Sequence, residues 1–407
     1  MNKLSVLFSA ACVSAALAST AAVAQSKPIR IGVPTAMQLQ VGRDTQTAVQ
    51  MAIDEVNAKG GVLGRKLEMV VADETENPET GISAIKKLTA DEKVDVLIGG
   101  YTSGVTLAQL PHISAAKTIY LGVGAASPAI TAKVKQDYDN YKYIFRVGPL
   151  HSGHQARELT NFIGSFVKGE LGISKIGIVG ENAKWVQDLV PMLKKGATEA
   201  GVDVRVTEMF DAQTSDFSPL FAKVKESGAQ YMIVVLSHAS SDVFAKQWHD
   251  SRFPMPYGGI DVKSMDGDFC DRVGGKSVGE MAVNFAVRAP ITPKTIPFFD
   301  EFRKRTKGSP VYTAFGANDA VFIYAQAATR AKSTDPSAVI KELEKTSYVG
   351  IPGTIEFDEM HDVKPGTATF KGPAYILAQW GDKCTREVIY PKSMRTADFV
   401  YPSWIKK

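Results

Sequence analysis

The residues with the clearest chemical potential lie in the stretch "IGGYTSGVTLAQLP" (98–111), where an apolar run gives way to a predicted helix. Gly99 and Gly100 end the apolar run, and Thr102 and Ser103 follow them. The first turn of a helix has unpaired N–H groups and a partial positive charge, so it favours an anion such as a carboxylate. The glycines would let a ligand approach the backbone, and Ser103 would either bond that ligand or only cap its own helix.

A second strand-to-helix turn, "GAASPAIT", begins at Gly124. Ser127 followed by Pro128 is typical of an N-cap and a first helical residue, and we expect Ser127 to act as a cap only. Ligands of open α/β sheets bind at the carboxyl ends of the strands. The two turns should therefore converge on one anion-binding spot.

The elements that would position these turns are strand-like runs alternating with amphipathic helical segments. Apolar strands in this alternation predict an α/β protein with parallel sheets covered on both faces. Two series of strands, divided near residues 143–153, predict two lobes, and the C-terminal third adds helices and a β-like tail. The expected strands are 29–36, 66–73, 94–100, 119–124, 175–181, 203–210 and 230–237, and the expected helices are 44–58, 79–91, 183–200, 314–331 and 336–345.

The first residues of the 407-residue chain, "MNKLSVLFSAACVSAALASTAAVAQ", have the pattern of a signal peptide. An early cation at Lys3 precedes an apolar stretch, and Ala22 and Ala24 form a small-residue cleavage site, so we expect residues 1–24 to be removed. Cys12 lies too early for a lipoprotein site. No later stretch approaches the ~18 apolar residues of a membrane span, so the mature protein should be exported and soluble.

Composition and motifs argue against several other classes of protein. The chain has 47 Lys and Arg against 43 Asp and Glu, and the scattered cations disfavour nucleic acid or a membrane surface as partner. The stretch "GVGAAS" (122–127) lacks the third glycine of the dinucleotide fingerprint, and no G-x-S-x-G elbow occurs. His151 and His154 have no acid or cysteine pair beside them that would complete a metal site. We expect no catalytic residue, no cofactor and no metal.

The segment 52–74, "AIDEVNAKGGVLGRKLEMVVADE", resembles the N-x-x-GG-x-x-G-R signature of the Leu/Ile/Val-type substrate-binding proteins of bacterial ABC transporters. Further motifs similar to that family follow in the right order over nearly the whole mature chain, in "GGYTSGVTLAQLP", "GAASPAIT", "YIFRVGP", "DFSPLFAKVKESGAQYMIV", "YTAFGANDAVFIYAQAATRA" and "GTIEFDEMHD". The resemblance implies a type I periplasmic binding fold, in which two Rossmann-like lobes joined by three crossovers close around a ligand. By analogy, the first lobe would take residues 27–146 and 286–350, and the second lobe 147–285 and 351–407.

The resemblance also implies ligand-binding residues in the first lobe. It places a ligand contact at Ser103. Gly124, Ala125 and Ala126 match positions that hold the carboxylate and ammonium of an amino acid through backbone groups and a threonine hydroxyl. Ala126 replaces that threonine, and Val41 stands where many relatives have an aromatic residue. These departures leave the class of protein intact and put specificity for branched-chain amino acids in question.

In the second lobe the resemblance implies two further contacts, at Asp261 and Trp185. Asp261 matches an acid that often pairs with the ligand ammonium, the alternative being a surface-turn aspartate. Trp185 falls where a cleft aromatic commonly stacks on the ligand, the alternative being a helix residue that packs inward. Ser237 and His238 follow a strand end and are expected to reach the cleft.

The function that the resemblance implies is that of a periplasmic solute receptor. Such a receptor would bind an amino acid or a related small carboxylate as a monomer and deliver it to an inner-membrane ABC permease. Two alternatives remain open at this stage. One is a ligand sensor of the same fold, and the other is a receptor for amides, urea or aromatic acids.

Two cysteines, Cys270 and Cys384, remain once the signal peptide is removed. In an exported protein they permit a single disulfide, and both should lie in the second lobe away from the cleft. The alternative is a pair of separate buried thiols that pack as small apolar groups.

Overall fold

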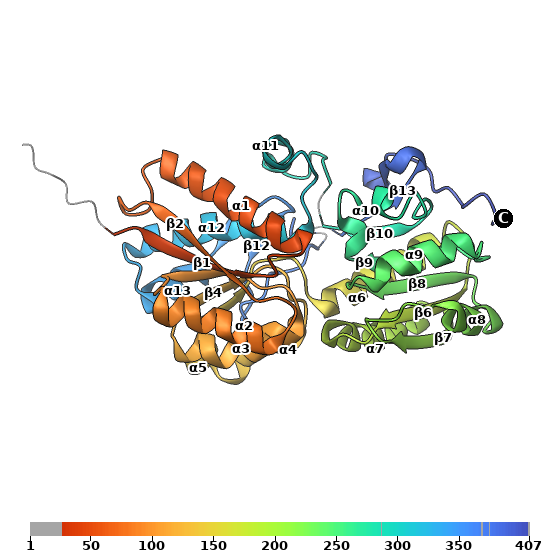
Figure 1. Ribbon diagram of the computed structural model, residues 1–407, viewed down its shortest axis with the longest axis horizontal. Coiled ribbons are helices and arrows are strands. Elements are labelled where there is room, and N and C mark those ends of the chain that lie inside the picture. Colours follow the sequence, from red (N-terminus) through yellow and green to blue (C-terminus); the bar gives the residue numbers. More distant parts are fainter. Residues whose placement is uncertain (1–26, 286, 368, 374, 406–407) are drawn as a thin grey trace, which may run out of the picture.

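Two sheets flanked by helices lie next to each other along the long axis of the molecule in the computed structural model (Figure 1). The structure describes residues 27–285, 287–367, 369–373 and 375–405. The predicted signal peptide, residues 1–24, lies outside the described residues. Within the described ranges no helix combines the length and the apolar character needed to cross a membrane. The predicted alternation of strands and helices is confirmed.

The first lobe contains five parallel strands in the order β2-β1-β3-β4-β5. Helices lie on both faces of this sheet, so its central strands are apolar along their length, and in β1 only Arg30 escapes full burial. The strands are β1 (Ile29–Thr35), β2 (Leu67–Asp73), β3 (Val96–Gly99), β4 (Ile119–Gly122) and β5 (Ile144–Arg146), and the hairpin β11 (Ser347–Val349) and β12 (Thr354–Glu356) forms a separate small sheet. The main helices are α1 (Gln40–Ala58), α2 (Pro78–Lys86), α3 (Ser103–Ala115), α4 (Pro128–Gln136), α11 (Thr295–Thr306), α12 (Tyr312–Ala331) and α13 (Pro336–Leu343).

The second lobe has seven strands in the order β14-β13-β10-β9-β8-β6-β7. The β-like C-terminal tail supplies β13 and β14, which add antiparallel strands to the otherwise parallel sheet. The strands are β6 (Lys175–Glu181), β7 (Asp203–Phe210), β8 (Tyr231–Leu236), β9 (Tyr257–Asp261), β10 (Met281–Asn284), β13 (Ile376–Trp380) and β14 (Arg386–Tyr390). The main helices are α6 (Ser152–Phe162), α7 (Lys184–Glu199), α8 (Ser218–Glu226), α9 (Ser240–Asp250) and the short α10 (Phe269–Arg272).

Helix α12 belongs to the first lobe although it lies far along the chain from α1, on which it packs. Its many alanines allow a close approach, and most of its residues are buried. Thr313 Oγ1 donates to the carbonyl of Val41 at 3.0 Å, and Asn318 Nδ2 donates to the carbonyl of Ala48 at 3.2 Å. Val41 is therefore a core residue of the α1–α12 contact.

The chain crosses between the lobes after β5, after β10 and between β12 and β13. The last crossing comes later than the predicted division at residue 350, because β12 pairs with β11. The rings of Phe357 and His361 then pack on Phe145 of β5, with ring centroids 5.1 and 3.9 Å away. Residues 351–361 thus lie against the first lobe.

Cys270 of α10 and Cys384, which follows β13, are joined by a disulfide whose Cα atoms are 5.5 Å apart. Both belong to a small apolar cluster of the second lobe with Phe269 and Trp380. The bridge therefore connects segments of one lobe and leaves movement between the lobes unrestricted.

Candidate ligand-binding site

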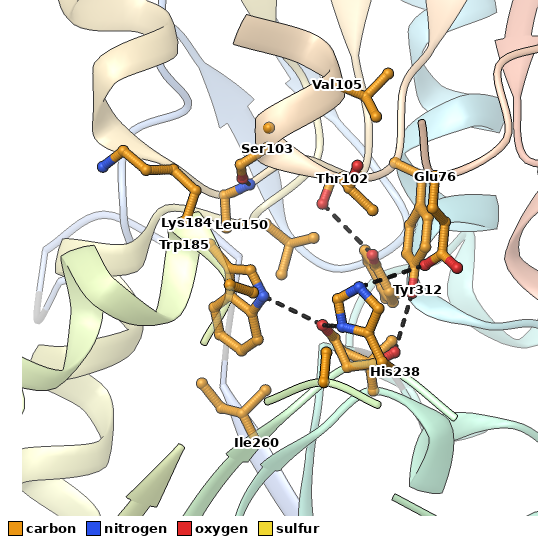
Figure 2. Close-up of a pocket in the computed structure, with 18 of the residues that line it drawn as sticks. Glu76, Thr102, Ser103, Val105, Leu150, Lys184, Trp185, His238, Ile260 and Tyr312 are labelled. Atoms are coloured by element: carbon orange, nitrogen blue, oxygen red, sulfur yellow. Dashed lines mark hydrogen bonds and ion pairs between the residues drawn. The ribbon is translucent and has the colours of Figure 1, made fainter. Parts of the chain in front are cut away.

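A cavity of about 210 Å³ lies between the lobes, where the carboxyl ends of strands from both sheets face each other (Figure 2). Its walls come mainly from the loops after β2, β3 and β4 on one side and after β6, β8 and β9 on the other. This is the position at which open α/β sheets bind ligands. The apolar part of the lining consists mainly of Tyr101, Leu150, Trp185, Ile260, Phe285 and Tyr312.

Gly99 and Gly100 are required by packing within the first lobe rather than by a ligand. A Cβ atom on Gly99 would lie 2.1 Å from the carbonyl oxygen of Pro34 in the neighbouring strand. Gly100 has φ +84°, and a Cβ atom there would lie 1.9 Å from the hydroxyl of Tyr120. Neither glycine lines the cavity, so the expected role of these glycines in ligand approach is not supported.

Ser103 lines the cavity and ties the two predicted turns together. Its Oγ accepts hydrogen bonds from the backbone N–H groups of Ala126 at 3.1 Å and Ser127 at 3.0 Å. A serine hydroxyl has two acceptor positions and one donor, so the O–H of Ser103 remains available to donate. The turn after β3 and the turn after β4 therefore meet at one spot, with Gly124 and Ala126 in the lining beside Ser103.

Ser127 caps α4, as expected, and also reaches the other lobe. Its Oγ accepts from the N–H of Ala129 at 3.3 Å and donates to Asp188 Oδ2 at 2.6 Å. A second link between the lobes runs from the hydroxyl of Tyr101 to the carbonyl of Ser237, at 3.2 Å. The two lobes thus contact each other across the cavity.

Trp185 and Ser237, both predicted from sequence, lie together in the wall that the second lobe provides. Trp185 Nε1 donates to Ser237 Oγ at 3.2 Å, and Ser237 Oγ donates to the buried carboxylate of Glu181. The indole is 8% exposed, so it presents an apolar surface to the cavity while its N–H is satisfied.

His238 is held next to this group by the same carboxylate. Its Nδ1 lies 2.8 Å from Glu181 Oε1, and its backbone N–H donates to Glu181 Oε2 at 3.0 Å. Burial lowers the pKa of His238, but the hydrogen bond and the charge of Glu181 outweigh burial and raise the pKa above its ordinary value. Burial likewise raises the pKa of Glu181, but the hydrogen bonds from His238 and Ser237 and the charge of His238 together outweigh burial, so the net pKa of Glu181 is lowered. The two residues therefore favour an ion pair.

Two of the predicted residues, Ala125 and Asp261, do not line the cavity. The carbonyl of Ala125 accepts from Arg146 Nη1 at 2.7 Å. Asp261 is fully buried, accepts from the N–H groups of Lys263 and Ser264, and is bonded by the Ser241 hydroxyl. Its neighbours in sequence, Ile260 and Val262, face the cavity instead. Asp261 is thus not positioned to pair with a ligand ammonium.

Several residues of the lining were not expected from the sequence. Glu76 follows the end of β2, so the rule that placed the other turns at the cavity also applies to it. Tyr101 and Lys184 are neighbours of expected residues. Phe285 directly follows β10, a strand that the sequence analysis did not predict, and Tyr312 begins α12, which only the fold brings to the cavity.

The cavity offers hydrogen-bond donors, acceptors and apolar surface to a small ligand. Its polar groups include the Ser103 hydroxyl, the N-terminus of α3, a lysine, an imidazole and a carboxylate. Among the residues that the structure describes, no group of three or more His, Cys, Asp or Glu side chains is arranged to hold a metal ion.

Two lobes with mainly parallel sheets that meet around a cavity define a two-lobed ligand-binding protein. The model of the periplasmic binding protein family matches residues 28–379, so the chain belongs to that family. The Leu/Ile/Val-binding protein homolog 1 of Brucella melitensis is 26% identical over 381 residues, which are 92% of this chain and 95% of the relative.

Solved structures share the fold at lower sequence identity. A leucine-binding protein of Thermotoga maritima has a TM-score of 0.76 at 18% identity, covering 89% of this chain and 97% of that one. An ABC-transporter solute-binding protein of Rhodopseudomonas palustris, solved with 3,4-dihydroxybenzoic acid, has a TM-score of 0.74 at 18% identity, covering 87% and 93%. The chain therefore has the architecture of substrate-binding proteins of ABC transporters.

Proposed function

We propose that this protein is a periplasmic receptor that binds an amino acid or a related small carboxylate between its lobes and delivers it to an ABC permease. The observation that carries the proposal is the meeting of two helix-start turns at the hydroxyl of Ser103 inside the interlobe cavity. The Brucella relative is named for amino acids, and the Rhodopseudomonas neighbour was solved with an aromatic acid; both kinds of ligand are carboxylates.

The carboxylate would lie at the N-terminus of α3. No side chain caps this helix, and residues 102–105 at its start line the cavity. Its first N–H groups and the free O–H of Ser103 together offer hydrogen-bond donors and a partial positive charge. The body of the ligand would contact Trp185 and Tyr312, which suit an aliphatic or an aromatic group equally well.

The proposed location of the protein is the periplasm. The signal-peptide pattern of residues 1–24 and the family together support a periplasmic location. We propose that the protein acts as a monomer, without cofactor or catalytic residues, and passes its ligand to an inner-membrane permease.

A thermal-shift panel of amino acids and aromatic acids with a single carboxylate, each paired with the derivative in which that carboxylate is a carboxamide, tests the proposal. A ligand at ~100 times its Kd should add about 2.7 kcal/mol to the free energy of unfolding. We expect acids to shift the midpoint, their matched amides to shift it much less, and Ser103→Ala to weaken the effect. Ser114→Ala, at the far end of α3, is the matched control. A flat response to every acid, or equal shifts by acids and amides, would refute the proposal.

A further inference from the structure

The end of the cavity away from Ser103 is formed by His238 of the second lobe and Glu76 of the first (Figure 2). His238 Nε2 lies 3.7 Å from Glu76 Oε1, which is longer than a hydrogen bond. The Glu76 side chain is 36% exposed. The two groups therefore face each other as a donor and an acceptor whose bond is incomplete.

The orientation of the imidazole is fixed from behind. Nδ1 bonds to the buried Glu181 at 2.8 Å, and Glu181 is itself held by the backbone N–H of His238 and the hydroxyl of Ser237. With a carboxylate on each side, at Nδ1 and at Nε2, the ring is favoured as an imidazolium, so Nε2 carries a proton and points into the cavity.

We propose that His238 and Glu76 form a subsite for a carboxamide, or a urea-like group, at the end of the ligand distant from its carboxylate. The amide oxygen would accept from His238 Nε2–H, and the amide NH₂ would donate to the Glu76 carboxylate. This inference rests on the proposed function, because the carboxylate at Ser103 sets which end of the ligand reaches the subsite.

The charges of the subsite disfavour other groups. A ligand ammonium would bond to Glu76 but be repelled by the imidazolium of His238. A ligand carboxylate would bond to the imidazolium but be repelled by Glu76. A hydrocarbon end would desolvate both His238 and Glu76 and give neither a partner, which costs more than a missing bond alone. A carboxamide, which accepts and donates side by side, satisfies both residues.

Calorimetric titration with ligands of equal shape tests this subsite. Leucine, asparagine and aspartate have side chains of similar size, as do 4-isopropylbenzoate, 4-carbamoylbenzoate and terephthalate, and glutamine and glutamate extend the amino-acid set by one carbon. We expect the amide in at least one set to bind at least tenfold more tightly than its acid and hydrocarbon counterparts, since bonds to charged groups distinguish them by about that factor.

The variant Glu76→Gln should reduce the preference for amide over acid to threefold or less. The matched control is Glu79→Gln, on the exposed first turn of α2 outside the cavity, which should leave the preference unchanged. The inference is overturned, and the proposed function kept, by the following result. Leucine binds as tightly as asparagine and glutamine, its binding depends on Ser103, and 4-carbamoylbenzoate binds no more tightly than 4-isopropylbenzoate or terephthalate. An amide preference that persists unchanged in Glu76→Gln would also overturn it. Absence of binding by every acid would overturn both.

Discussion

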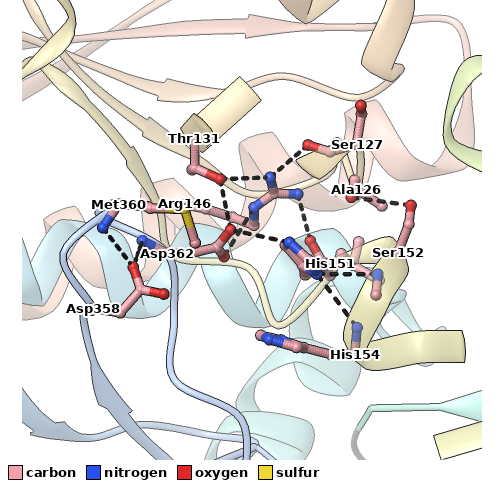
Figure 3. Close-up of polar contacts among 12 residues, drawn as sticks. Ala126, Ser127, Thr131, Arg146, His151, Ser152, His154, Asp358, Met360 and Asp362 are labelled. Atoms are coloured by element: carbon pink, nitrogen blue, oxygen red, sulfur yellow. Dashed lines mark hydrogen bonds and ion pairs between the residues drawn. The ribbon is translucent and has the colours of Figure 1, made fainter. Parts of the chain in front are cut away.

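Removing the carboxylate of Asp362 should destabilise the first lobe, because it would leave Arg146 as a buried cation without its counter-ion. Arg146 is 2% exposed and Asp362 1%, and Arg146 Nε lies 3.1 Å from Asp362 Oδ1 (Figure 3). Asp362 Oδ2 also accepts from the Thr131 hydroxyl at 2.7 Å. The pair joins β5 to the segment that leads into the last crossover.

Removing one partner of a buried ion pair costs about 3–5 kcal/mol. Arg146 keeps other acceptors, since its Nη1 donates to the carbonyls of Ala125 and Leu150 and its Nη2 to the carbonyl of Ser127. We therefore expect Asp362→Ala to cost about 3 kcal/mol, at the lower end of that range. For a cooperative unit of 150–250 residues, this corresponds to a fall of about 6–12 °C in Tm.

Urea unfolding followed by circular dichroism measures this cost. Glu359→Ala provides the matched control, because Glu359 lies in the same loop and pairs with Lys135 at the surface, where both side chains are more than half exposed. The control should show no resolvable change. If Asp362→Ala shifts the urea midpoint no more than Glu359→Ala does, the buried pair is not the stabilising contact described above.

Three further outcomes are expected. Replacing Cys270 and Cys384 by serine should lower the free energy of unfolding by about 2–5 kcal/mol, and two free thiols titrated in the unfolded, unreduced protein would contradict the bridge. Burial raises the pKa of Asp44 to about 7, above its unfolded value, so its stabilising effect is full below about pH 4 and is lost as the pH rises through 7. The Tm should accordingly fall less between pH 5.5 and 8 in Asp44→Asn than in the wild type, and an unchanged fall would contradict this. Tyr101→Phe removes the hydrogen bond to the Ser237 carbonyl that links the lobes, so it should weaken ligand binding about fivefold. Calorimetry measures this change, and equal affinities of the variant and the wild type would contradict it.

The fold was largely predictable because parallel strands buried on both faces are continuous apolar runs. The strands that escaped prediction carry weaker signals. β5 (Ile144–Arg146) is short, and β9 contains Gly258 and Gly259, which have low strand propensity. Gly258 is nevertheless required there, because a Cβ atom would lie 2.6 Å from the Tyr231 hydroxyl.

Cavity-lining residues were predictable only where their position just after the end of a strand brings them to the cavity. Ser103, Trp185 and Ser237 each follow a strand end, and the structure places them on the cavity. Asp261 also ends a strand, but successive side chains of a strand point to opposite sides, and Asp261 points away from the cavity. A one-residue error in the predicted position of the strand is enough to reverse the predicted direction of its side chain. Glu76 and His238 face each other only because of how the two lobes meet, and no local sequence pattern predicts that arrangement.

A crystal structure of the protein with the acid that gives the largest thermal shift tests the central claim most directly. We predict density for the ligand between the turns of Ser103 and Gly124 on one lobe and Trp185 and His238 on the other, with its carboxylate within hydrogen-bond distance of Ser103 Oγ. Ligand density anywhere else, such as the surface groove beside Phe298 and Tyr348 on the first lobe, with the interlobe cavity holding none, would contradict the account.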